Sequence, residues 1–404
     1  MKVIVDLHIH SKYSRACSKQ LELPQIARAC ERKGIGVVVT GDFTHPQWFS
    51  DIKKELKEDA DGVFILADGS SSTKFILGTE LSCIYKDKDK VRRLHLLVFA
   101  PSIEAVEKLN KELEDRGCNL KADGRPILGL KAKELLQICL DIDDRFEMIP
   151  AHAWTPWFAI FGSKSGYDSL EECFEELTPK IRAIETGLSS DPPMNRRLRA
   201  LDGIALVSNS DAHSLRKLGR EANVLELEEI TYRSVMDAIA SGDPKQFLYT
   251  IEFYPEEGKY HHDGHRDCDV SFTPEQSEKA DGRCPKCAKP LTIGVLNRVV
   301  ELADRTAEQV DMSKFIPEKK IVPLEEIISD VVGVGVASKR VQGMYEKMIE
   351  KIGNEFYILL DANEQEIAAG SDETIAKAVM RVRSGDIFVE PGYDGVFGKV
   401  KVFK

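Results

Sequence analysis

The chain has 404 residues, of which 42% are apolar and 30% charged, and its net charge is −11. This length suggests two or three domains with a sizeable core. The acidic balance argues against a broad basic surface that coats nucleic acid, although bound divalent cations could supply positive charge locally. No run of eighteen apolar residues occurs, which excludes a membrane span, and Asp6 and His8 interrupt the first apolar stretch, unlike a signal peptide. We therefore expect a cytoplasmic protein without a membrane partner.

Short apolar runs alternate with helix-like segments over residues 1–248. The runs that indicate strands are 3–5, 36–39, 75–77, 94–99, 148–149 and 204–207. Segments 23–32 and 103–116 between them carry apolar residues at helical spacing. The alternation predicts an α/β domain of parallel strands and crossover helices, either a barrel or an open doubly wound sheet.

The rest of the chain differs in character. Residues 249–322 open with a polar, turn-rich stretch and continue into a predicted helix over 296–312. Residues 323–404 are predicted to form a small α+β accessory domain. Helices are expected near 324–331, 338–352 and 373–384. Strands are expected at 356–360, 386–390 and 396–403.

Six of the nine histidines lie in or just after a predicted strand. They are His8, His10, His45, His95, His152 and His213. A single histidine is more often a hydrogen-bonded structural residue than a ligand, but six at corresponding places are harder to explain in that way. The carboxylates Asp42, Glu80 and Asp211 also follow strands, and the C-terminal strand ends of a βα barrel converge on one rim. Imidazoles with carboxylates suit zinc, manganese or iron, and neighbouring ions would activate water for attack on phosphorus.

Four motifs resemble the polymerase and histidinol phosphatase (PHP) family. In chain order they are Asp6-Leu7-His8-Ile9-His10, Gly78-Thr79-Glu80, Pro150-Ala151-His152 and Ser210-Asp211-Ala212-His213. The resemblance implies a distorted seven-stranded βα barrel over residues 1–248, with two or three divalent ions (zinc, manganese or magnesium) that act on phosphoesters.

The ligands of these ions are carried over from the family motif by motif. The resemblance implies that one ion is held by His8, His10, Glu80 and Asp211, and a second by Glu80, His95 and His152. His213 would help to hold a third ion, and which of Asp42 and His45 is a ligand stays open. The implied catalytic residues are Glu80, Asp211, His8 and His10.

A second ligand pattern lies outside this domain. His265 and Cys268 are separated by two residues, and so are Cys284 and Cys287. Such spacing supplies four ligands for one tetrahedral, structural zinc. His261 and His262 lie close by and stay open as alternatives, although His265 matches the spacing of the cysteine pair. A redox role for the cysteine pair is weaker, because that motif normally opens a helix after a strand.

The order of these parts is similar to the endonuclease Q family of DNA repair enzymes. The similarity includes the segments 40–46, 151–157 and 254–261. It implies a lesion-specific endonuclease that cuts damaged DNA on the 5′ side of a deaminated base (uracil, hypoxanthine or xanthine) or an abasic site. The ends left would be a 3′-hydroxyl and a 5′-phosphate.

Recognition of a deaminated base requires its edge to enter a pocket, which indicates base flipping. The aromatic stretch after His152 could stack on bases or could pack a loop onto the barrel; it comprises Trp154, Trp157, Phe158 and Phe161. Arg196 and Arg197 could contact phosphates or form a solvated helix face. The segment with Gly333, Gly335 and Lys339 resembles a helix-hairpin-helix turn, which could bind a phosphate or simply connect two helices.

Two other functions compete with this interpretation. A small-molecule phosphoesterase of the histidinol-phosphatase type would explain the barrel but would leave the rest of the chain without a role. A non-enzymatic nucleic-acid-binding protein would not need the ligand set. A sliding clamp stays open as a further partner, and no clamp-binding peptide is recognisable at Val402-Phe403-Lys404.

Overall fold

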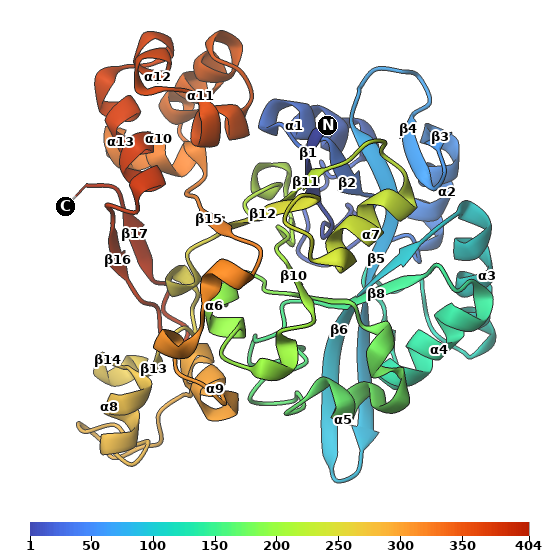
Figure 1. Ribbon diagram of the computed structural model, residues 1–404, viewed down its shortest axis with the longest axis horizontal. Helices are drawn as coiled ribbons and strands as arrows, with labels where there is room; N and C mark the ends of the chain where they lie inside the picture. Colours follow the sequence, from blue (N-terminus) through green and yellow to red (C-terminus); the bar gives the residue numbers. More distant parts are fainter. Residues whose placement is uncertain (404) are drawn as a thin grey trace.

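The computed structural model describes residues 1–403 and has a large mixed sheet at its centre (Figure 1). The sheet has eleven strands in the order β15-β12-β11-β1-β2-β5-β4-β3, with β6 and β7 paired to β5, and β8 paired to β6. Its strands are β1 (Lys2–Asp6), β2 (Val37–Val39), β3 (Leu56–Ala60), β4 (Val63–Leu66), β5 (Lys74–Asp87), β6 (Lys90–Ala100), β7 (Ile127–Leu128), β8 (Glu147–Pro150), β11 (Ala222–Glu226), β12 (Phe247–Glu252) and β15 (Glu318–Lys320). A separate parallel pair, β9 (Ala183–Glu185) and β10 (Ala205–Val207), contacts the sheet through β8.

The expectation of purely parallel strands is wrong. Strands β1, β2 and β5 are parallel, but β5 and β6 form a long antiparallel hairpin that pairs from Leu77↔Ala100 to Asp87↔Lys90. The turn between them is only two residues long, and Lys88 has a φ of 52°. So short a connection can join only antiparallel strands, because a parallel crossover needs a dozen residues or more.

Helices of the first domain bury one apolar face against the sheet. They are α1 (Leu23–Lys33), α2 (Pro46–Glu55), α3 (Ile103–Asp115), α4 (Ala132–Ile142), α5 (Leu170–Phe174), α6 (Pro192–Asn195) and α7 (Tyr232–Ser241). In α3 the side chain of Ser102 caps the N-terminus by accepting from Ala105 N, and Val106, Leu109 and Leu113 are buried at helical spacing. The predicted helices over 23–32 and 103–116 are confirmed.

Residues 263–302 form a small unit beside the sheet. It contains the antiparallel pair β13 (Asp263–His265) and β14 (Val270–Phe272), and the helices α8 (Pro274–Lys279) and α9 (Val295–Leu302). Its own core consists of Val270, Cys284 and Leu291. The helix expected over 296–312 ends at Leu302, and short 3-10 turns follow it.

The C-terminal unit is mainly helical. Its helices are α10 (Leu324–Val332), α11 (Lys339–Lys351), α12 (Glu364–Gly370) and α13 (Glu373–Ser384), and its strands are β16 (Phe388–Glu390) and β17 (Lys399–Lys401). The strand expected at 356–360 is wrong, because Tyr357–Asp361 is a π-helical turn with Ile358 and Leu359 buried. A short apolar run without alternation fits either structure, and here the segment packs on α13. The last expected strand, over 396–403, is shorter in the structure, where β17 spans Lys399–Lys401.

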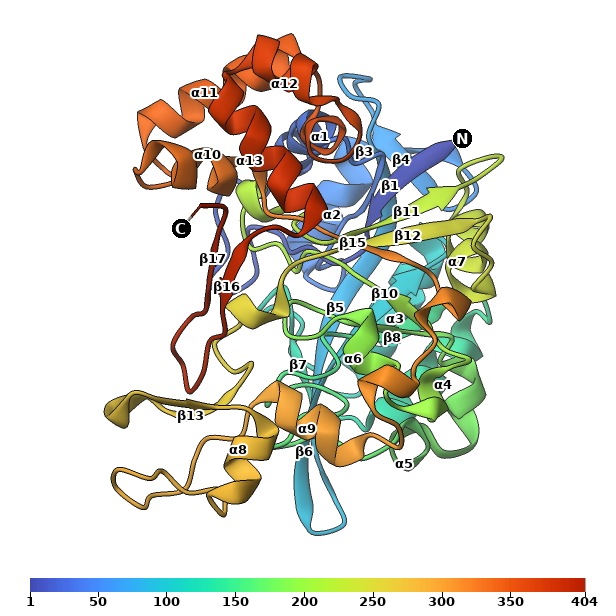
Figure 2. The ribbon, with the colours of Figure 1, turned by 60° about the vertical axis from the view of Figure 1, so that its left-hand side comes forward.

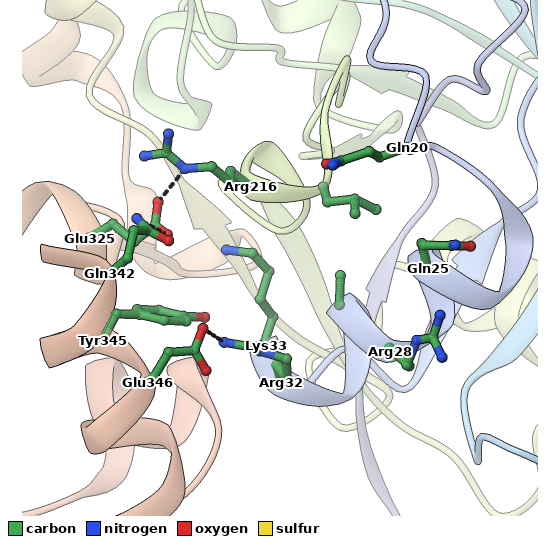
Figure 3. Close-up of a pocket in the computed structure, with 12 residues that line it drawn as sticks. Gln20, Gln25, Arg28, Arg32, Lys33, Arg216, Glu325, Gln342, Tyr345 and Glu346 are labelled. Atoms are coloured by element: carbon green, nitrogen blue, oxygen red, sulfur yellow. Dashed lines mark hydrogen bonds and ion pairs between the residues drawn. The ribbon is translucent and has the colours of Figure 1, made fainter. Parts of the chain in front are cut away.

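The helical unit docks on α1 and on the turn over 215–217. In the ion pairs between them the first domain supplies the cation and the C-terminal unit supplies the carboxylate. Figure 3 shows the cleft between them, where Arg216 faces Glu325 and Arg32 faces Glu346. The β16–β17 hairpin extends from the helices toward β13 (Figure 2). At its tip, Asp394 accepts hydrogen bonds from Arg266 N and Thr292 Oγ1, at 2.8 and 2.7 Å. Within residues 1–403, no helix combines the length and the apolar character that a bilayer crossing requires.

Candidate metal centre

Four side chains converge where β1, β5 and the segment after β10 meet. His8 and His10 alternate along the extended chain after β1 and therefore share a face. Nε2 of His8 lies 3.4 Å from Oε2 of Glu80 and 3.5 Å from Oδ1 of Asp211, and Nε2 of His10 lies 3.1 and 3.2 Å from the same oxygens. Among the described residues, neither Nε2 atom nor Asp211 Oδ1 has a hydrogen-bond partner. Three buried ligand atoms without hydrogen bonds that meet a carboxylate oxygen of Glu80 fit a shared cation.

The other oxygen of Glu80 belongs to a second group. Oε1 lies 2.7 Å from His95 Nδ1 and 3.2 Å from His152 Nε2, and these two nitrogens are 3.1 Å apart. The ligand atoms of each group all lie within 4.8 Å of one another. Glu80 therefore divides its two oxygens between two adjoining groups, as a carboxylate that bridges two ions would.

Three of the imidazoles are held through the nitrogen that faces away from the groups. Nδ1 of His8 lies 3.1 Å from both oxygens of Glu185, Nδ1 of His10 lies 3.0 Å from Asp42 Oδ1, and Nδ1 of His152 lies 3.0 Å from Thr155 Oγ1. Such outer partners fix the tautomer and the ring orientation of metal-binding histidines.

The charge states of the two carboxylates and of His95 suit metal binding, whereas, against the effect of burial, the surrounding carboxylates raise the pKa of His8 and of His10. Burial alone would raise the pKa of Glu80 and of Asp211, but His95 and Arg125 beside Glu80, and His8 beside Asp211, lower both values below the ordinary range. Burial lowers the pKa of His95 to about 4. Both carboxylates are therefore ionised at neutral pH and His95 is neutral, as metal ligands must be.

The backbone is strained at two of these residues. His152 has a φ of 30° and Asp211 a φ of 45°, both unusual for residues other than glycine. Gly187 makes room for the first, because a Cβ at that position would lie 2.6 Å from the Cβ of His152. Strain of this kind persists where the surrounding structure holds a side chain in a required direction.

The structure does not assemble a third group from the expected residues within 1–403. Both oxygens of Asp42 form hydrogen bonds, one with His10 and the other with Ser11 and Ser14. Asp42 therefore orients His10 and is not itself a member of a ligand group. His45 begins α2 and stacks on Tyr13, with ring centroids 4.3 Å apart. His213 lies against the ring of His10 but belongs to neither group.

Sequence reasoning missed two residues of this centre. Glu185 contacts His8 and also accepts a hydrogen bond from His152 N at 2.7 Å. It ends strand β9, so the strand-end argument could have found it. Arg125 donates to Glu80 Oε2 at 2.9 Å from an irregular loop, and no sequence pattern points to it.

The four residues of the predicted zinc motif also lie together. The ligand atoms of His265, Cys268, Cys284 and Cys287 lie within 4.8 Å of one another, whereas His261 and His262 are not in this group. Burial would raise the pKa of Cys284, but the N–H groups of Lys286 and Cys287 lower it, which favours the thiolate that a metal requires.

Two of the expected DNA contacts are wrong because their side chains are buried. Trp154 is 1% exposed and its Nε1 donates to Asn195 Oδ1 at 2.7 Å. Arg196 is 4% exposed and donates to backbone carbonyls, including that of Ile204. Trp154 therefore packs its loop onto the sheet, and Arg196 supports the backbone to which it donates. Phe161 is buried in the same core.

Other members of the expected DNA-binding set are accessible. Trp157 is 39% exposed, and Phe158 is half-buried with its ring 4.6 Å from that of His95. Arg197 is half-buried, and its Nε donates to the carbonyl of Arg305. The predicted turn between α10 and α11 is confirmed, and its exposed members are Gly333, Gly335 and Lys339.

The fold and these groups define a mixed α/β protein with a candidate multinuclear metal centre and a separate four-ligand group. The lesion-specific endonuclease PfuEndoQ from Pyrococcus furiosus has a similar structure, with a TM-score of 0.88 and 32% sequence identity over 99% of this chain and 95% of that chain. Endonuclease Q in complex with a 27-mer duplex carrying an abasic lesion is similar as well, with a TM-score of 0.86 and 33% identity over 99% and 96% of the two chains. This chain belongs to the endonuclease Q family.

Sequence comparisons add a family model and a further relative. Residues 323–386 match the model of the MJ0043 C-terminal domain. The uncharacterised protein MJ0043 of Methanocaldococcus jannaschii is 33% identical over 257 residues, which is 62% of this chain. The match spans only 31% of the length of MJ0043.

Proposed function

We propose that this protein is a metal-dependent DNA repair endonuclease. It hydrolyses the phosphodiester on the 5′ side of uracil, hypoxanthine, xanthine or an abasic site and leaves a 3′-hydroxyl and a 5′-phosphate. The observation that carries the proposal is the division of the Glu80 oxygens between two ligand groups. Membership of the endonuclease Q family supports DNA as the substrate, because two structures of that family concern lesion-specific cleavage and a duplex with an abasic lesion.

The residues of the centre have distinct roles in this proposal. His8, His10, Glu80 and Asp211 hold one divalent ion, and Glu80, His95 and His152 hold a second. Ions bound there would activate a water molecule and neutralise charge that develops on the phosphate. Arg125 adds positive charge beside the bridging carboxylate, where a phosphodiester would approach.

The other parts of the chain support this centre. In the proposal, β1, β2, β5, β6, β8, β9 and β10 form a distorted PHP-type barrel within residues 1–248. Residues 249–322 carry a structural zinc on His265, Cys268, Cys284 and Cys287. The C-terminal unit offers the turn at Gly333 and Gly335 to the DNA backbone, and the half-buried Arg197 is a further candidate contact.

A deaminated base must leave the duplex before its edge can be read. The ring of Phe158 lies 4.6 Å from that of His95, and the exposed Trp157 precedes it in the chain, so in the proposal a base flipped next to the cut phosphate would reach this segment. Stacking does not distinguish uracil from cytosine, so hydrogen bonds to the base edge must supply that discrimination.

The test is cleavage of end-labelled duplexes that each carry one lesion, beside an undamaged duplex and a phosphomonoester. The proposal expects cuts 5′ to each lesion and ends that a DNA ligase can reseal. Hydrolysis of the monoester alone would favour a small-molecule phosphoesterase, and binding without cleavage would favour a nucleic-acid-binding protein.

The matched variant is Glu80→Gln, which keeps the shape of the side chain and removes its charge. It should abolish cleavage and leave DNA binding and the melting temperature close to those of the parent. Glu346→Gln, at an exposed carboxylate of α11, serves as the control. Near-normal turnover of Glu80→Gln would contradict the proposed metal centre.

A further inference from the structure

A cavity that no residue of the metal centre lines has not yet been assigned a role. Its volume is about 580 Å³, and it is enclosed by β6, the loop over 157–168 and α9. The β5–β6 hairpin runs past α9 in Figure 2. Five cationic side chains line the cavity against two carboxylates, although the chain as a whole has a net charge of −11. The cations are Lys90, Arg92, Arg93, Lys164 and Arg298, and the carboxylates are Asp168 and Glu301.

Two of the cations are engaged in holding the wall of the cavity. Arg298 binds Asp168 and Glu301, so both lining carboxylates pair with one arginine. Arg92 donates to the carbonyl of Gly166 and covers the ring of Tyr167, with 3.9 Å from its Cζ to the ring centroid. These contacts leave the remaining positive charge of the cavity without compensation.

The other three cations are available to a ligand. Within the described part of the chain, the side chains of Lys90, Arg93 and Lys164 form no ion pair with a carboxylate. Many other surface cations of this protein pair with an acid, as Lys53 does with Glu107. Three unpaired cations in one cavity therefore indicate an anionic ligand.

The loop that carries Lys164 has the sequence Gly-Ser-Lys-Ser-Gly, over 162–166. A Cβ at Gly162 would lie 2.5 Å from the carbonyl oxygen of Thr155, and one at Gly166 would lie 2.4 Å from the nitrogen of Gly162. Only glycine fits at these two positions, so the loop lies tightly folded on the 155–160 segment. The N–H groups of Gly162, Lys164 and Gly166 donate to backbone carbonyls, so the loop offers the Lys164 side chain and not its backbone to a ligand.

The cavity adjoins the second ligand group. Arg93 and His95 are alternate residues of β6 and share one face, with their Cα atoms about 6.8 Å apart. His95 N donates to the carbonyl of Phe158 at 2.9 Å, and the exposed Trp157 lines the cavity. A polyanionic strand could therefore place one anionic group at the metal centre and the next anionic group in the cavity.

We propose that this cavity is a phosphate subsite that binds a DNA backbone phosphate next to the one that is cut. Arg93 and Lys164 pair with the phosphate, and Lys90 extends the positive charge toward the tip of the hairpin. The inference rests on the proposed function and adds to it the part of the protein that positions the strand. A phosphate contact sets register and carries no base information, so it serves all lesions equally.

The test uses Arg93→Gln and Lys164→Gln, each placed in a Glu80→Gln background so that DNA is bound and not cut. Fluorescence anisotropy measures the affinity for a uracil duplex and for an abasic duplex over a range of salt concentrations. Loss of one phosphate contact should reduce the slope of log K against log [salt] by about 0.9 and weaken binding equally on both duplexes. Lys57→Gln is the matched control, since Lys57 is an exposed cation on β3 at the far edge of the sheet.

Cleavage measurements with Glu80 intact complete the test. Arg93→Gln and Lys164→Gln should raise the DNA concentration needed for half-maximal rate and leave the rate at saturation within about threefold of the parent. Salt slopes and affinities equal to those of Lys57→Gln would overturn the inference even if the parent cuts lesions. A parent that binds lesion duplexes but cuts none would instead overturn the proposed function. A fall in the saturated rate with an unchanged salt slope would also overturn the subsite, because it would assign these residues to the chemistry.

Discussion

At the residue scale, exposure separates Trp157 from its buried neighbour Trp154. Stacking on a base is worth about 1–3 kcal/mol, which corresponds to about 5- to 150-fold in rate or affinity. We expect Trp157→Ala to weaken single-turnover cleavage of a uracil duplex by this factor and to affect an abasic duplex much less, because an abasic site has no base to stack.

The control is Trp154→Phe, which removes the hydrogen bond to Asn195. It should lower stability and affect both substrates alike. Equal losses for Trp157→Ala on both duplexes, with the fold intact, would mean that Trp157 supports the loop or the DNA backbone and not a base.

Glu252 is a residue whose titration should be visible in stability. It is fully buried, its Oε2 accepts from Thr186 Oγ1 at 3.3 Å, and its Oε1 has no hydrogen-bond partner within residues 1–403. Burial, and then the nearby carboxylate of Glu318, raise its pKa to about 8. The folded protein therefore keeps a proton that the unfolded chain releases near its ordinary pKa.

Stability should consequently fall as pH rises from about 5 to about 8, with a slope of at most about 1.4 kcal/mol per pH unit from this group. Glu252→Gln imitates the protonated acid and should flatten the dependence of melting temperature on pH. The measurement is thermal unfolding at pH 5, 6, 7 and 8, and an unchanged slope in the variant would contradict the assignment.

At the scale of elements, α1 and the C-terminal helices are joined by a buried ion pair. Lys33 Nζ lies 2.7 Å from Glu355 Oε2, and Glu355 also accepts from Tyr345 OH at 2.9 Å and from Leu324 N at 3.0 Å. Removing one partner of such a pair leaves a buried charge without compensation, so Glu355→Ala should cost about 3–5 kcal/mol of unfolding free energy.

The same interface contains its own control. Arg32 pairs with Glu346, and both side chains are largely exposed. Arg32→Ala should therefore cost less than about 1 kcal/mol. Denaturant unfolding measures both variants, and equal costs would show that burial does not set the strength of this interface.

At the scale of the whole molecule, the protein has one large core and one satellite. The large core runs from the sheet into the C-terminal helices, whereas Val270, Cys284 and Leu291 form a separate core in the unit of residues 263–302. Three residues are too few to stabilise a fold by apolar burial alone, so under the proposed function we expect this unit to depend on a metal held by its four-ligand group. Cys284→Ser should remove about one zinc per chain and unfold this unit at a lower temperature than the rest.

Zinc content by atomic absorption and calorimetry of the same sample measure both effects. Cys118→Ser, at a half-buried cysteine outside the ligand group, should leave zinc content unchanged. Full zinc content and an unchanged first transition in Cys284→Ser would contradict a structural zinc.

Much of this molecule could be predicted from sequence because its signals are local. The alternation of His8 and His10 on an extended chain decides that both imidazoles face one side, and the spacing of Cys284 and Cys287 decides that both thiols can reach one point. Apolar spacing likewise predicted the helices over 23–32 and 103–116.

Only the tertiary structure decided which long-range neighbours these residues have. It brought Glu185 and Asp42 behind the imidazoles, turned β5 and β6 into an antiparallel hairpin, and buried Trp154. Residue type and spacing determine which face a side chain takes within its own element. Whether that face meets solvent, a partner carboxylate or the core depends on elements far away in the chain, and no local pattern contains that information.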